Sequence, residues 1–178
     1  MKDNFDLEVK KILKQAESEM FALNHPYVGS EHMLLAILKI SSLKDLLGDF
    51  SLTYESFKDE LISIVGVSHK KSELALYTPL LKRIISDAID EAEETAEKVV
   101  KPEHLLIGML EEGEGVGIRI LMNMNVDLES IYNELIHRNS KGHQNKSSIL
   151  YDIGKLMGTK TDDRVYKRER EISTLIEV

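Results

Sequence analysis

VGSEHMLLAIL at residues 28–38 and VKPEHLLIGML at residues 100–110 are two versions of one stretch, and they decide the fold. Each places a Glu-His pair directly before an apolar run of the kind that forms a buried helix. When the chain is compared with itself at a shift of 72 residues (103 − 31), related residues meet in both halves. The matched pairs include Phe5 with Tyr77, Asp6 with Thr78, Val28 with Val100, Glu31 with Glu103, and His32 with His104. The sequence therefore contains two copies of one unit.

The spacing of apolar residues predicts helices along both copies. Over residues 5–23 apolar side chains recur every three or four positions, which places them on one stripe of a helix. Further helices are expected after residue 30, over residues 53–65, and from residue 78 through the acidic stretch that ends near residue 100. No segment alternates between apolar and polar residues convincingly enough to predict a strand.

Helix starts are marked by the residues that usually cap them. Asp6, Ser30 and Thr78 are the expected N-caps, because their side-chain oxygens can accept hydrogen bonds from amides of the first turn. Pro79 directly follows Thr78 and suits the first helical position. The sequence therefore predicts an all-α fold.

Two four-helix repeats, residues 5–66 and 77–138, account for the pattern. Neither repeat would bury much apolar surface alone, so we expect the two to share an apolar seam with pseudo-twofold symmetry. Together they would form one globular domain over residues 1–138. The polar residues NSKGHQNKSS that follow predict a linker over 139–161. A short C-terminal segment, 162–178, completes the chain.

Composition argues against several classes of function. The net charge of −8 and the pI near 5.3 argue against a nucleic-acid partner, since proteins that bind the phosphate backbone usually show a basic face. Without cysteine the chain forms no disulfide and no thiolate metal site, which is compatible with a reducing cytoplasm. No run of about 18 apolar residues occurs, so no membrane span is expected. We therefore expect a cytoplasmic protein that binds neither nucleic acid nor membrane.

Several motifs together resemble a known family. The doubled SEHMLLAIL and PEHLLIGML, the YTPLLKRII that opens the second copy and the EEGEGVGIRIL at 111–121 resemble the N-terminal double-repeat domain of Clp-family AAA+ unfoldases, most closely the ClpC type. The resemblance runs from about Phe5 to Ile136. The stretch TDDRVYKREREISTLIEV at 161–178 is similar to the entrance of the first AAA+ module of that family. Tyr166 and Lys167 depart from it, because the family has there an Ile-Gly pair that lies against the nucleotide base.

The resemblance implies a protein-binding function. The domain would sit above an ATPase ring and pass on protein substrates, brought by adaptor proteins or recognised by their own marks. The ring, its ATP and Mg²⁺, and the Clp peptidase would belong to the full-length parent protein, of which this chain holds the N-terminal domain and an incomplete AAA+ module.

This chain is not expected to be an enzyme by itself. An ATPase of this class needs a Gly-rich phosphate loop that ends in Gly-Lys-Ser/Thr, and the sequence contains none. GEGVG at 113–117 lacks the lysine and is predicted to be a loop between helices. GKLMGTK at 154–160 has the wrong spacing. We therefore expect no catalytic residue and no cofactor in this chain.

Glu31 and Glu103 are the candidate binding residues. A carboxylate in the first turn of a helix lies beside free amides and the positive end of the helix dipole, which stabilise it as an anion. There it can hold a guanidinium or ammonium group in a charge-assisted pair. In ClpC-type members that recognise phosphorylated arginine, a glutamate of each copy pairs with the guanidinium, and the phosphate rests near the start of that copy's first helix. The resemblance assigns these roles to Glu31 and Glu103 and, on the phosphate side, to Asp6 and Thr78.

The two copies are expected to differ in how they treat a phosphate. Thr78 offers a hydroxyl and helix-start amides, which suit an anion. Asp6 offers a negative charge, and like charges about 4 Å apart repel by about 4 kcal/mol at an effective dielectric constant of 20. A hydrogen bond to a charged group contributes only about 1.5–3 kcal/mol. We therefore predict that phosphoarginine prefers a site made of Thr78 and Glu103.

The same residues also have purely structural interpretations. Asp6, Ser30 and Thr78 can cap helices without any ligand, and a glutamate in a first turn is favourable by itself. His32 and His104 are predicted to be structural, because neither copy has the two-histidine helical spacing of a zinc hydrolase. No metal site is expected.

Two other functions stay open at this point. One is a small all-α enzyme or ligand carrier, which would need Glu31, His32, Glu103 and His104 to converge in one closed pocket with shifted pKa values. The other is a free-standing regulator of a separate Clp machine.

Overall fold

The computed structural model describes residues 4–140, and this part of the chain is helical. The first repeat holds α1 (Leu7–Ala22), α2 (Ser30–Ile40), α3 (Lys44–Gly48) and α4 (Tyr54–Ile64). The second holds α5 (Pro79–Glu93), α6 (Pro102–Glu112), α7 (Val116–Asn123) and α8 (Leu128–Ser140). Within residues 4–140 the extended backbone forms two isolated bridges and no strand. The predicted all-α fold of two four-helix repeats is confirmed.

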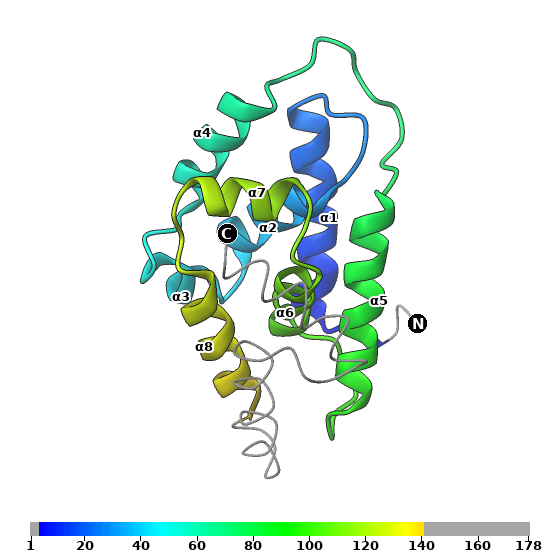
Figure 1. Cartoon of the computed structure of the whole chain (residues 1–178). Helices are drawn as coiled ribbons and strands as arrows, with labels where there is room; N and C mark the ends of the chain where they lie inside the picture. The colour runs from blue at the N-terminus through cyan, green and yellow to red at the C-terminus, as the bar shows by residue number, and fades with distance from the viewer. Residues whose placement is uncertain (1–3, 141–178) are drawn as a thin grey trace.

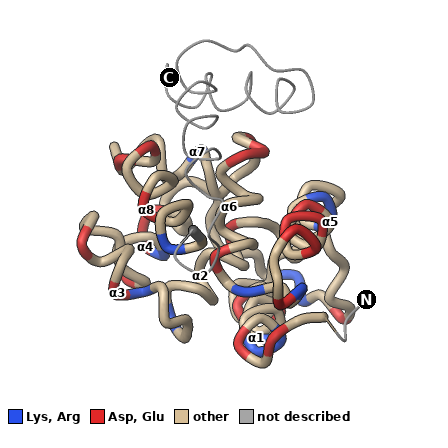
Figure 2. Tube along the Cα trace, turned by 90° about the horizontal axis from the view of Figure 1, so that it is seen from below, with Lys and Arg blue, Asp and Glu red and all other residues tan. Residues whose placement is uncertain are grey.

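The central helices of the fold are α2 and α6, one from each repeat. Both are buried along almost their whole length after the first turn, because they pack against helices of both repeats. Helices α1 and α5 lie side by side on one flank, and α3, α4 and α8 lie on the other (Figure 1). Acidic and basic residues are distributed over these outer helices and do not gather on one face (Figure 2). The two VGSEHMLLAIL-like stretches therefore form the core of the domain.

Two isolated bridges between the repeats are equivalent under a pseudo-twofold axis. Phe5 pairs with Val100, and Val28 pairs with Tyr77. The shift of 72 converts one bridge into the other, since 5 + 72 = 77 and 28 + 72 = 100. The hydrogen bonds match as well: Asp6 N donates to Val100 O at 3.0 Å, and Thr78 N donates to Val28 O at 3.0 Å. The first helix of each repeat therefore begins beside the second helix of the other repeat.

The helix caps confirm two of the three sequence predictions. The Asp6 carboxylate accepts from Val9 N at 2.9 Å, and the Thr78 hydroxyl accepts from Leu81 N at 3.1 Å. Ser30 was predicted as the N-cap of α2, and that prediction is wrong. Gly29 holds the N-cap position, and the Ser30 hydroxyl instead accepts from Gly117 N of the second repeat at 3.3 Å.

The histidine of each Glu-His pair has the same structural role in both repeats, which accounts for its presence in both copies of the sequence. His32 Nδ1 accepts from the N-cap amide of Gly29 at 2.9 Å, and His104 Nδ1 accepts from the N-cap amide of Lys101 at 2.9 Å. Each imidazole thus does what a glutamate or glutamine does at the third position of a capping box. The prediction that both histidines are structural agrees with this geometry.

The end of α5 differs from the sequence prediction, and the predicted linker and C-terminal segment lie largely outside the described residues. Helix α5 ends at Glu93, short of the expected residue 100, because Thr95 accepts from Lys98 N and donates to Ala92 O, which closes the last turn. Helix α8 continues to Ser140. The rest of the predicted linker and the whole of residues 162–178 lie outside the described residues, so these boundaries stay predictions.

Candidate functional site

The four predicted site residues form two groups at helix starts, but not in the predicted combination. Thr78 begins α5 beside the start of α2, which carries Glu31. Asp6 begins α1 beside the start of α6, which carries Glu103. We call these groups the Thr78–Glu31 entrance and the Asp6–Glu103 entrance. The prediction that Thr78 and Glu103 share a site is wrong, because the bridges pair each first helix with the other repeat.

The Thr78–Glu31 entrance holds a carboxylate that is mostly withdrawn from solvent. The Glu31 side chain is 13% exposed and curls back over Gly29. A Cβ atom at residue 29 would lie 2.4 Å from Glu31 Oε1, so the carboxylate occupies space that glycine leaves empty. Glu31 also packs near the start of α7, where Gly117 approaches its backbone amide. Glycine at position 29 therefore permits this position of the carboxylate.

Burial raises the pKa of Glu31, and two weaker effects oppose it. The Glu31 backbone amide and the neighbouring His25 lower the pKa, but desolvation is the largest cause. Within residues 4–140 no lysine or arginine lies within 4 Å of this carboxylate. A desolvated carboxylate without a cationic partner gains most when a cation is brought to it. The Thr78–Glu31 entrance therefore holds a desolvated carboxylate that a cationic partner would stabilise.

A chain of hydrogen bonds through two buried histidines supports this entrance. His25 Nδ1 lies 2.8 Å from His32 Nε2, and His25 Nε2 lies 2.8 Å from Gly66 O. His32 Nδ1 accepts from Gly29 N, so its Nε2 carries the proton and donates to His25 Nδ1. The remaining His25 Nε2–H then donates to the carbonyl of Gly66. Burial and the nearby His25 lower the pKa of His32 to about 3, so its ring stays neutral.

The same hydrogen bonds argue against a metal at this position. His25, Glu31 and His32 place ligand-type atoms within 4.8 Å of one another, which is the spacing of a possible metal site. A metal needs an imidazole nitrogen with a free lone pair. Both lone pairs in this pair of rings already accept a hydrogen bond, one from Gly29 N and one from His32 Nε2. The residues present therefore do not fit a metal ion in this arrangement.

The Asp6–Glu103 entrance has the same backbone but different side chains. Lys101 and Pro102 stand where the first repeat has Gly29 and Ser30. The Lys101 ammonium donates to the Glu97 carboxylate. That bond is the largest cause of the raised pKa of Lys101; burial is the next largest and opposes it, and the charges of Glu97, Glu103 and Asp6 raise the pKa by less. This entrance therefore already contains a cation.

Comparison with known proteins places the chain in a family. Residues 4–83 and 76–168 each match the Clp repeat (R) N-terminal domain. The chain belongs to this family. The two matches correspond to the two halves related by the pseudo-twofold axis, so the duplication seen in the sequence and in the bridges is the repeat of the Clp family.

Curated relatives of this Clp repeat chain are ClpC proteins. The ATP-dependent Clp protease ATP-binding subunit ClpC of Staphylococcus saprophyticus is 28% identical over 185 residues, which is 95% of this chain and 23% of the relative. The negative regulator of genetic competence ClpC/MecB of Bacillus subtilis is 28% identical over 190 residues, 98% of this chain and 24% of the relative. The chain thus spans about a quarter of their length.

A solved structure has the same fold as this Clp repeat domain. The N-terminal domain of the caseinolytic protease associated chaperone ClpD from Arabidopsis thaliana superimposes with a TM-score of 0.66 at 17% identity. The match covers 78% of this chain and 99% of the ClpD domain. At this identity the comparison concerns the fold alone, and it agrees with the double-repeat fold.

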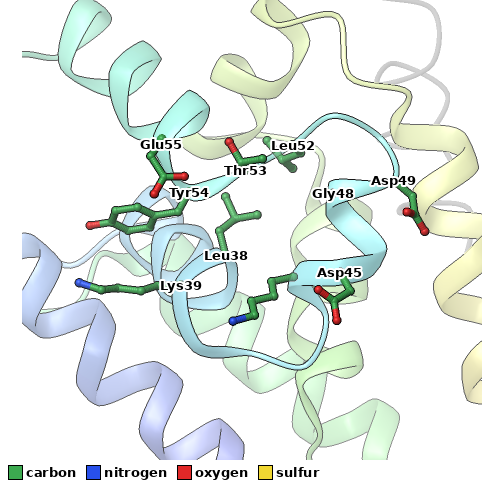
Figure 3. A pocket seen from close by; sticks show the side chains of 10 residues that line it. Leu38, Lys39, Asp45, Gly48, Asp49, Leu52, Thr53, Tyr54 and Glu55 are labelled. Atoms are coloured by element: carbon green, nitrogen blue, oxygen red, sulfur yellow. The ribbon is translucent and has the colours of Figure 1, made fainter.

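Two clefts of this Clp repeat domain are not lined by Glu31, Glu103 or their histidines, although one of them includes Phe5 and Tyr77, the residues directly before Asp6 and Thr78. One is bounded by the end of α2, by α3 and by the start of α4, where Lys39, Tyr54 and Asp45 line it (Figure 3). Another lies between α1 and α5, where the Tyr77 hydroxyl donates to Glu17 at 2.7 Å. The two Glu-His pairs line neither cleft. The clefts therefore give no support to an enzyme or ligand carrier built on those four residues.

Sequence reasoning missed His25 and Lys101 as parts of the candidate site. His25 lies seven residues before His32, on the other side of a turn that contains Pro26, so helical spacing gave no signal for the contact. Lys101 is visible when the copies are aligned, because it is the position at which a glycine is replaced by a cation.

In residues 4–140 no helix is long and apolar enough to cross a membrane.

Proposed function

We propose that this chain is the domain of a Clp-type ATPase subunit that binds protein substrates and adaptor proteins. The parent protein would deliver these proteins to its ATPase ring, with ATP and Mg²⁺, and to the Clp peptidase in the cytoplasm. The names of the curated relatives support the parent's class. The observation that carries the binding role is the Glu31 carboxylate, which keeps 13% of its side chain exposed and has no lysine or arginine within 4 Å in the described residues.

The proposed ligand at this carboxylate is an arginine side chain, with phosphoarginine as the specific form. The guanidinium would pair with the desolvated Glu31 carboxylate, which the structure leaves without a lysine or arginine partner in the described residues. The phosphate would lie at the start of α5, where Thr78 supplies a hydroxyl. Pro79 has no amide hydrogen, and the Leu81 amide donates to the Thr78 hydroxyl at 3.1 Å, so the hydroxyl is the group that this turn offers in the proposal. Because Thr78 carries no charge, this entrance lacks the repulsion that Asp6 would cause.

Titration calorimetry of the chain with an arginine-phosphorylated peptide tests the proposal. We expect Glu31→Gln to weaken binding by about 10- to 150-fold, because a hydrogen bond to a charged group contributes about 1.5–3 kcal/mol. Glu129→Gln is the matched control, since Glu129 is an exposed first-turn glutamate of α8 far from either entrance in the sequence. Equal affinity of the Glu31→Gln variant and the unmodified chain would remove the basis of the proposal.

A further inference from the structure

The two entrances differ at one position that controls their charge. Residues 25 and 29 of the first repeat correspond to residues 97 and 101 of the second, since 25 + 72 = 97 and 29 + 72 = 101. In the first repeat these positions hold His25, which bonds to His32, and Gly29, which has no side chain. In the second they hold Glu97 and Lys101, which form an ion pair. A buried histidine and a buried glycine have thus been replaced by a charged pair at the surface.

Backbone contacts hold Lys101 at the mouth of its entrance. The preceding residue, Val100, donates to Asn4 O at 2.7 Å and accepts from Asp6 N at 3.0 Å, so residue 101 follows directly on the pairing with the start of α1. The Lys101 amide is itself fixed by the bond to His104 Nδ1. The backbone of Lys101 is therefore fixed beside the start of α1, two residues before Glu103, and Glu97 holds its ammonium.

We propose that Lys101 is a resident cation that closes the Asp6–Glu103 entrance to arginine side chains, so that the chain offers one open entrance, Thr78–Glu31. The inference rests on the proposed function, because it assumes that these entrances bind arginine. A guanidinium that approaches Glu103 meets the tethered ammonium of Lys101, whereas one that approaches Glu31 meets no resident lysine or arginine in the described residues. The tether keeps the ammonium at a high local concentration that a free ligand must overcome. The phosphate of a phosphoarginine is in addition repelled by Asp6.

The test counts binding sites by calorimetry with an arginine-phosphorylated peptide. The unmodified chain is expected to bind one peptide, and Lys101→Gly, which copies residue 29 of the first repeat, is expected to bind a second. Combining Lys101→Gly with Asp6→Thr should tighten the second site, since it also copies Thr78. Lys98→Gly is the control for loss of a positive charge nearby. Lys98 is exposed and has a φ of 55°, where glycine is favoured, so this change should fold and still bind one peptide.

Each outcome separates the inference from the proposed function. One site in the unmodified chain and still one in Lys101→Gly and in the double variant overturns the inference and leaves the proposed function standing. Two sites in the unmodified chain, or weaker binding at Glu103 after Lys101→Gly, also overturns it, because Lys101 would then not exclude the ligand. No site in the unmodified chain contradicts the proposed function; a site that then appears in Lys101→Gly supports the inference, and its absence overturns both. Lys101→Met retains the side-chain stem and repeats the test if the glycine variant fails to fold.

Discussion

At the scale of single residues, local chemistry was predictable and long-range partners were not. Asp6 and Thr78 were recognised as caps because a cap depends on a side chain and the amides that directly follow it. Ser30 has the same chemistry, but its hydroxyl is used by Gly117, which is 87 residues away. The capping role of His32 was also missed, because imidazole is not among the usual capping side chains. The type of a residue therefore predicts whether it caps a helix only where no group from a distant part of the chain forms a hydrogen bond with its side chain.

The buried His32 makes stability depend on pH. Its pKa is about 3 in the folded chain and about 6.5 when exposed. Below pH 6.5 the unfolded chain binds a proton at His32 that the folded chain does not bind. The contribution of His32 to the free energy of unfolding is therefore fully present above pH 6.5 and falls by about 1.4 kcal/mol per pH unit below it. The raised pKa of Glu31 acts in the opposite direction, because the folded chain then takes up a proton more readily as the pH falls.

Urea unfolding at pH 7.5 and pH 5.5 measures this effect. We expect the unmodified chain to lose about 1.4 kcal/mol more than His32→Gln over this range, since glutamine can retain the capping bond but does not titrate. A parallel comparison with His137→Gln, which replaces an exposed histidine of α8, is the control for the substitution. The same pH dependence in the unmodified chain and in His32→Gln would show that the buried ring is not responsible.

At the scale of helices, the sequence predicted where they occur better than how they pack. The three- and four-residue spacing identified α1, α2, α4 and α5, because periodicity directly reports which face is buried. GEGVG at 113–117 was expected to be a loop between two helices; residues 113–115 join α6 to α7, but Val116 and Gly117 already belong to α7. Its close approach to α2 could not be read from the sequence, because it depends on contacts between the repeats. The actual end of α5 was missed because Thr95 forms a local turn there.

Gly115, the N-cap of α7, is predicted to be intolerant of substitution. Its φ of 100° is unfavourable for other residues, and a Cβ atom there would lie 2.2 Å from Leu80 Cδ2 and 3.2 Å from Ser30 Oγ. We expect Gly115→Ala to lower the free energy of unfolding by about 1–3 kcal/mol, from backbone strain and overpacking together. The measurement is urea denaturation.

Gly48 supplies the matched control for Gly115. It lies in α3 with no atom within 4 Å of its would-be Cβ, so Gly48→Ala should be neutral or stabilise by up to about 1 kcal/mol. If Gly115→Ala and Gly48→Ala had the same effect on stability, crowding at the start of α7 would not be the cause.

At the scale of the whole molecule, the symmetry was predictable but the exchange of partners was not. The shift of 72 residues identified equivalent positions in the two copies. Self-comparison does not tell which copy supplies the neighbours of a given helix, and the natural assumption that each copy builds its own site proved wrong. The bridges of Phe5 with Val100 and of Val28 with Tyr77 show that each entrance takes one helix start from each copy.

Because the central helices pack against both repeats, neither repeat is expected to fold alone. Fragments 1–76 and 77–140 should each lack a cooperative thermal transition by circular dichroism, and mixing them should restore one. Buried apolar residues cover most of α6, among them Leu105, Leu106 and Ile107, so separation would expose much apolar surface. A sharp transition in either fragment by itself would refute the shared core.

The bridge between Phe5 and Val100 can form only some time after Phe5 has been synthesised. The two partners are separated by 95 residues (100 − 5), so the start of α1 leaves the ribosome long before its partner is made. At translation rates of about 5–20 residues per second, this interval lasts roughly 5–20 seconds. During it the nascent first repeat has neither its bridge partner nor the second central helix. The apolar helices of the first repeat therefore wait through this interval before the helices that bury them in the folded domain are made.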